Sequence, residues 1–111
     1  MLGGNMVDGI NELINLVYDN IATVSIGNLL KLRQKFSFKE GEEGFSPEEF
    51  CEKFIQLCID KTKEESDCFA LGRLINRTLK FQKHLKLNGR KDSMMDIYLL
   101  DLRKIMREEL Y

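Results

Sequence analysis

Apolar residues recur at spacings of three and four along almost the whole chain, and this period is what most constrains the fold. Such a repeat puts apolar side chains on one face of an α-helix, whereas a half-buried strand alternates at every second residue. No alternation longer than a few residues is present, and the single proline, Pro47, stands where a helix is expected to begin. The pattern predicts helices over residues 6–21, 25–37, 47–60, 65–87 and 93–110.

Capping residues support these boundaries. Ser46-Pro47-Glu48-Glu49 combines a serine N-cap, a proline at the first helical position and a glutamate three residues after the cap. Asn88-Gly89 is a favoured end for the fourth helix. The second helix has Thr23 or Ser25 as a candidate N-cap, and the fifth has Ser93 with Asp96. For the fourth helix the candidates are Thr62, paired with Glu65, or Ser66 alone.

Five helices joined by short loops predict an all-α fold, a single compact bundle spanning residues 1–111. The length suits one hydrophobic core, and no stretch approaches the roughly 18 apolar residues of a membrane span. The first residues lack the basic and apolar regions of a secretory signal. Since Cys51, Cys58 and Cys68 lie in apolar surroundings, we expect reduced thiols and a cytoplasmic location. We also expect no membrane contact, because the apolar face of the fourth helix is needed for the core.

Residues that would support catalysis or metal binding are sparse. The single histidine, His84, lies in a lysine-rich segment, and Cys51 and Cys58 are seven residues apart on an apolar helical face, as is typical of core thiols. Gly41-Glu42-Glu43-Gly44 has two carboxylates where a phosphate loop needs bare amides and a lysine. We therefore expect a protein that is not an enzyme, with no catalytic residues, no metal and no cofactor.

The acidic segment before the third helix resembles the exit half of an EF-hand. Counting twelve positions back from Glu49 puts Phe38 at the first ligand position, where calcium requires an oxygen. The segment therefore predicts an acidic loop followed by a helix cap, and we expect Glu40, Glu42 and Glu43 to bind no calcium of consequence.

Positive charge is concentrated in one part of the chain. Between Asp67 and Asp92 there is no acidic residue, and on a helical projection Arg73, Arg77 and Lys80 share with His84 an arc of about 60° opposite the apolar face. This predicts an exposed basic ridge. The candidate nucleic-acid-binding residues are Arg73, Arg77, Lys80, Lys83, His84, Lys86, Arg90 and Lys91, together with Lys31, Arg33 and Lys35. The last three belong with Lys39 to a second basic cluster, and Arg103, Lys104 and Arg107 form a third.

A basic ridge of this kind suits phosphate groups, because arginine grips two phosphate oxygens and lysine adds a point charge. It predicts contact with the backbone of nucleic acid, DNA or RNA, rather than readout of bases. The alternative is charge pairing between proteins. Residues 40–67 hold ten acids against three bases, so the ridge can instead pair with this half, within the monomer or between copies. The chain would then be a helical protein–protein interaction module.

A bundle of about five helices with basic faces and no catalytic motif resembles the small subunits of CRISPR effector complexes. The segments that carry the resemblance are residues 29–36 and 73–86, and it is a resemblance of architecture. It implies a subunit of a nucleoprotein complex in antiviral defence, with other protein subunits and further copies of itself as partners. In such a complex the acidic Glu40–Glu52 segment would face away from the nucleic acid.

Overall fold

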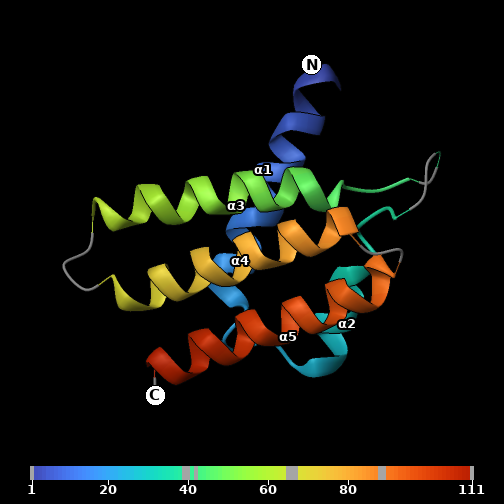
Figure 1. Cartoon of the computed structure of the whole chain (residues 1–111). Coiled ribbons are helices and arrows are strands. Elements are labelled where there is room, and N and C mark those ends of the chain that lie inside the picture. Colours follow the sequence, from blue (N-terminus) through green and yellow to red (C-terminus); the bar gives the residue numbers. More distant parts are fainter. Residues whose placement is uncertain (1, 39–40, 42, 65–67, 88–89, 111) are drawn as a thin grey trace.

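The computed structural model describes residues 2–38, 41, 43–64, 68–87 and 90–110, with side chains described from residue 9 to residue 108. Five helices account for most of this part of the chain: α1 (Leu2–Asn20), α2 (Ile26–Arg33), α3 (Pro47–Thr62), α4 (Phe69–Leu87) and α5 (Lys91–Leu110) (Figure 1). The only β pairing among the described residues is an isolated bridge between Phe36 and Phe45. The all-α prediction is confirmed.

The helices are arranged in two layers. α3, α4 and α5 lie side by side and antiparallel with α4 in the middle, and α1 crosses behind them at a steep angle (Figure 1). α2 lies behind one end of α5 and packs against it, while α1 packs against α3. None of the described helices is long and apolar enough to cross a lipid bilayer.

Two predicted caps are confirmed. The Ser25 hydroxyl accepts a hydrogen bond from the Asn28 amide at 3.2 Å, and the Ser46 hydroxyl accepts one from the Glu49 amide at 3.3 Å. Pro47 occupies the first position of α3, where the missing N–H costs nothing.

Other helix ends differ from the prediction. α2 ends at Arg33 rather than residue 37, because the next three residues form tighter turns in which each amide bonds three residues back. α4 begins at Phe69 rather than residue 65, and Thr62 does not cap it, since its hydroxyl donates to the Ile59 carbonyl. α5 begins at Lys91, two residues before Ser93. Ser66, Asn88 and Gly89 lie outside the described residues.

All five helices contribute to one core. Aromatic rings form its centre: the rings of Phe81 and Tyr98 stack at 4.2 Å, and Phe50 stacks on Phe54 at 5.4 Å and meets Phe36 edge-on at 5.3 Å. The aliphatic and sulfur-bearing residues buried around them are Ile10, Leu13, Ile14, Val17, Ile21, Leu29, Cys51, Cys58, Leu71, Leu74, Leu85, Met95, Leu99, Leu102 and Ile105.

One polar pair is buried inside this core. The hydroxyls of Thr78 and Tyr98 are 2.7 Å apart, and Thr78 donates its proton to the Leu74 carbonyl at 2.8 Å. Because a hydroxyl has a single proton, Tyr98 must be the donor to Thr78. Burial, as the largest cause, raises the pKa of Tyr98 well above its ordinary value.

The bridge between Phe36 and Phe45 closes the loop that joins α2 to α3. The Ser37 amide donates to the Phe45 carbonyl and the Phe45 amide donates to the Lys35 carbonyl, each at 2.9 Å. Gly44 makes this approach possible: its φ is +138°, and a Cβ there would lie 2.9 Å from backbone atoms of residues 35–37. We call this pairing the loop clasp.

Candidate nucleic-acid interface

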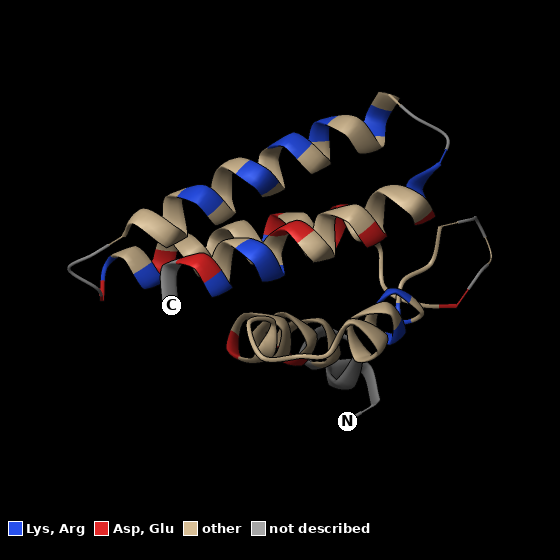
Figure 2. Ribbon diagram, turned by 90° about the horizontal axis from the view of Figure 1, so that it is seen from below, with Lys and Arg blue, Asp and Glu red and all other residues tan. Residues whose placement is uncertain are grey.

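α4 is the helix on which the predicted basic residues are concentrated. It carries Arg73, Arg77, Lys80, Lys83 and Lys86 and no acidic residue along its 19 residues. Figure 2 shows the blue segments repeating along α4, with α5 below it carrying both signs of charge. Its opposite face is apolar as predicted, because the buried residues of α4 are Leu71, Leu74, Thr78, Phe81 and Leu85.

The N-terminal half of α4 is paired with acids on α5. Arg73 Nη2 lies 3.0 Å from Glu108 Oε2, and Arg77 Nε lies 2.7 Å from Asp101 Oδ2. The Arg77 side chain is only 19% exposed, and its guanidinium lies 5.5 Å from the centre of the Tyr98 ring. The prediction of an exposed position is therefore wrong for Arg77, while Arg73, whose side chain is 37% exposed, lies at the surface as one partner of an ion pair. They hold α4 against α5.

The C-terminal half of α4 keeps its charges exposed. Lys80, Lys83, His84 and Lys86 are all exposed, and none of them forms an ion pair with a described residue. We call these four residues the α4 lysine face.

The register of the two antiparallel helices explains the difference between the halves. Arg77 is level with Asp101, and Thr78 is level with Tyr98, so each further turn of α4 meets an earlier turn of α5. At the level of Lys80 and His84, α5 presents Ile97, which is 56% exposed, in place of an acid. The acid next to Ile97, Asp96, lies 2.8 Å from Arg33 and so is paired with α2 rather than with the α4 lysine face.

Several other predicted residues are engaged elsewhere. Arg33 Nε lies 2.8 Å from Asp96 Oδ1, although the N–H does not point at the oxygen well enough for a hydrogen bond. Lys91 Nζ lies 3.2 Å from Glu48 Oε1. Burial alone would raise the pKa of Glu48, but its hydrogen bonds from the backbone, Lys91 and Ser46 outweigh burial and leave the pKa below its ordinary value.

The remaining basic residues are scattered. Lys31 and Lys35 are exposed, but α2 lies in the layer behind α5, so they do not join the α4 lysine face (Figure 1). Arg90 is exposed just before α5. Arg103 is held by a hydrogen bond from its Nε to the Val24 carbonyl at 2.8 Å. Lys104 and Arg107 are exposed on α5.

The signal that sequence reasoning missed lies on α5. Asp101 and Glu108 are seven residues apart, which puts them on one helical face, and Arg73 and Arg77 are one turn apart on α4. Two helices joined by a short connection run antiparallel, so their facing residues meet at a nearly constant sum of residue numbers. That rule brings these acids opposite these arginines, whereas the prediction looked for partners in residues 40–67.

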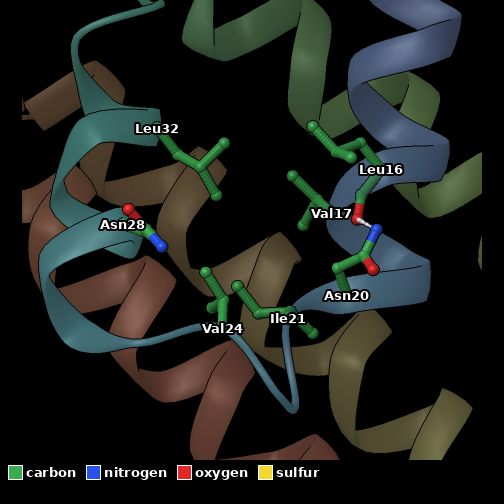
Figure 3. Close-up of a pocket in the computed structure, with 7 residues that line it drawn as sticks. All are labelled: Leu16, Val17, Asn20, Ile21, Val24, Asn28 and Leu32. Carbon is green, nitrogen blue, oxygen red and sulfur yellow. Dashed lines mark hydrogen bonds between the residues drawn. The ribbon is translucent and has the colours of Figure 1, made fainter.

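An apolar hollow of about 200 Å³ opens between α1 and α2 (Figure 3). Leu16, Val17, Ile21, Val24 and Leu32 point towards it, and two asparagines stand at its sides. The amide of one of them donates to a carbonyl of its own helix, from Asn20 Nδ2 to Leu16 O at 3.0 Å. Because no side chain that lines it is acidic or basic, the hollow offers no acid–base chemistry.

The other candidate groups have these positions. Cys51 and Cys58 are free and buried, as predicted, and burial raises the pKa of each thiol to about 12, which leaves them protonated at neutral pH. Cys68 is half-buried, and its thiol donates to the Thr62 carbonyl at 3.6 Å. Glu43 is exposed, while Glu40 and Glu42 lie outside the described residues. Within the described part of the chain, no three acidic, cysteine or histidine side chains are grouped closely enough to hold a metal ion.

Comparison with protein-family models, with curated proteins and with solved structures found no match for this chain.

Proposed function

We propose that this chain is a non-enzymatic binding protein whose α4 lysine face contacts the phosphate backbone of nucleic acid within a larger nucleoprotein assembly. The observation that carries the proposal is the division of α4 into a paired half and an unpaired half. Glu108 and Asp101 neutralise Arg73 and Arg77, yet Lys80, Lys83 and Lys86 remain exposed on a helix without acids. Several like charges held on one rigid face attract a polyanion, and binding releases its condensed counterions.

The lysine chemistry favours backbone contact over base readout. Lysine acts on phosphate as a point charge, whereas the planar guanidinium forks of α4 that would suit a base edge are paired with Glu108 and Asp101. The assembly that the sequence resemblance suggests is a CRISPR-type effector complex, in which a bundle of this size would bind along the backbone and contact other subunits.

A second candidate function has its own observation. Leu87 is 76% exposed and Ile97 is 56% exposed, and both lie beside the α4 lysine face. Lysines interleaved with aliphatic residues also suit an acidic amphipathic segment of a partner protein. This would make the chain a protein–protein interaction module.

The test is a binding titration with labelled DNA and RNA at several salt concentrations. Backbone contact predicts an affinity that falls linearly on a log–log salt plot. The variant Lys80→Gln/Lys83→Gln should bind all nucleic-acid sequences more weakly, and the salt slope should shrink by roughly 0.7–0.9 for each phosphate that the variant no longer neutralises. Arg73 and Arg77 are left in place because they join α4 to α5.

The matched control is Lys53→Gln/Lys63→Gln, which removes the same charge from exposed lysines of α3 and its C-terminal turn. It should leave the salt slope unchanged. Absence of binding at low salt, or an equal weakening of binding by the control, would reject the proposal. Binding of an acidic helical peptide by the wild-type chain, abolished by Leu87→Ser, would establish the second candidate instead.

A further inference from the structure

We infer that the nucleic acid bound by the α4 lysine face is double-stranded, and that this surface does not accommodate a single strand. The inference rests on the proposed function and deepens it. Three observations lead to it: the position of α4 in the fold, the location of the aromatic rings, and the state of the arginines.

α4 is the outermost helix on its side of the molecule (Figure 2). α4 lies between α3 and α5 in Figure 1, and in Figure 2 it forms the outer edge of the molecule, on the side away from α1 and α2. The two hollows described for this fold, including the second of about 340 Å³ beside Phe45, are lined by α1, α2 and the loop clasp. Proteins that bind single strands draw them into a charged groove, and neither of these two hollows is lined by a residue of α4.

The aromatic residues that would stack on unpaired bases are placed elsewhere. The Phe81 ring, on α4 itself, faces inward and stacks on Tyr98, and both residues are buried. Among the described phenylalanine and tyrosine side chains only Phe69 is exposed, and eleven residues of helix put it about 16 Å along the axis from Lys80. The lysine face therefore has no phenylalanine or tyrosine within reach and offers one small ring, the His84 imidazole, whereas single-strand binders gain much of their affinity from stacking successive bases on aromatic side chains.

The arginines of α4 are not available to stack on unpaired bases. A guanidinium plane can stack on a base, but Arg73 and Arg77 are held by Glu108 and Asp101. What remains exposed is the His84 imidazole and three ammonium groups, which interact with phosphate through their charge. Lys80, Lys83 and Lys86 follow one another at three-residue steps, a span of about 9 Å along the axis.

A short, rigid array of point charges gains most from the densest polyanion. A duplex carries one charge per about 1.7 Å of its axis, and one of its strands carries one per about 3.4 Å. Over the span of the three lysines the duplex thus offers twice the charge. It also holds that charge on a stiff convex backbone that needs no ordering.

The experiment compares a 20-base-pair DNA duplex with each of its separate strands, at the same salt concentrations. We expect the duplex to bind at least tenfold more tightly at 50 mM salt, with a log–log slope near −2.7 for three phosphate contacts. Lys80→Gln/Lys83→Gln/Lys86→Gln should remove the preference, because the chain then has no dense array to match. Circular dichroism of this variant checks that the helices remain, since all three residues are exposed.

The outcomes separate this inference from the proposed function. Equal or tighter binding of the single strands, still abolished in the triple variant, would overturn the duplex inference and leave backbone binding in place. Binding of neither form would overturn both. A duplex preference that survives in the triple variant would place the duplex site elsewhere on the molecule and so reject the inference.

Discussion

The phenol of Tyr98 lies in the centre of an aromatic core, and Thr78 provides its one acceptor. The two residues are not equivalent in this pair. Thr78 has a second partner, the Leu74 carbonyl, whereas Tyr98 has none besides Thr78 among the hydrogen bonds described. Removing the Thr78 hydroxyl therefore leaves the Tyr98 hydroxyl without an acceptor, whereas removing the Tyr98 hydroxyl leaves Thr78 with its hydrogen bond to Leu74.

We expect Thr78→Val to destabilise the fold more than Tyr98→Phe. The first leaves the Tyr98 hydroxyl buried without an acceptor, at a cost of about 1–3 kcal/mol, while the second removes one hydrogen bond at a cost of about 1 kcal/mol. Urea unfolding followed by circular dichroism measures both. The double variant should be destabilised by less than the sum of the two single effects. A larger effect for Tyr98→Phe would show that the pair does not bond in this direction.

At the scale of secondary-structure elements, the loop clasp fixes how α2 leads into α3. It depends on Gly44, because at φ +138° a side chain is strained and a Cβ would lie 2.9 Å from Lys35 O. We expect Gly44→Ala to lower the free energy of unfolding by about 1–3 kcal/mol. The matched control is Gly72→Ala in α4, where a Cβ meets no atom within 4 Å.

The control should change stability in the opposite direction. Alanine in a helix interior is better than glycine by roughly 0.5–1 kcal/mol, so Gly72→Ala is expected to stabilise the fold. Chemical denaturation of both variants under the same conditions gives the comparison. A Gly44→Ala protein as stable as the wild type would mean that the clasp opens without consequence for the bundle.

For the whole molecule, the two buried thiols of Cys51 and Cys58 lower the free energy of unfolding as the pH becomes alkaline. Burial raises the pKa of Cys51 and of Cys58 from 9.0 to about 12. Above pH 9 the unfolded chain releases these protons while the folded chain retains them, so stability is complete below pH 9 and declines between pH 9 and 12. Each thiol contributes up to about 1.4 kcal/mol per pH unit in that window.

Unfolding free energies measured at pH 7.5, 9 and 10 under reducing conditions test this dependence. Cys58→Ala should be less stable at pH 7.5 but show a shallower decline above pH 9 than the wild type. If the decline is as steep in Cys58→Ala, the alkaline destabilisation comes from other groups.

Much of the whole fold could be predicted from the sequence, because local signals determine it. Apolar spacing identified the five helices, and the Ser25 and Ser46 caps lie where a side-chain oxygen can reach an amide three residues on. Ends that depend on tertiary contacts were missed. α2 stops at Arg33 because the chain must turn back towards Phe45, a residue with no periodic relation to it.

The candidate site was predictable only in part, for the same reason. Helical spacing correctly collected the basic residues of α4 on one side, but exposure depends on what the next helix presents. Asp101 and Glu108 pair with Arg77 and Arg73, whereas Asp96 pairs with Arg33 and Ile97 stands exposed beside it. Facing residues of two helices become known only once their register is known.

The loop clasp also makes the arrangement of the helices independent of the length of the loop between residues 37 and 45. Since hydrogen bonds join residues 35 and 37 to residue 45, the ends of the intervening segment stay together as long as Gly44 is kept. Lengthening a closed loop costs little, about 0.6 kcal/mol for each doubling. In evolution, this is where the chain can gain or lose residues without disturbing the helices, and in the laboratory it is the natural place to graft a foreign peptide.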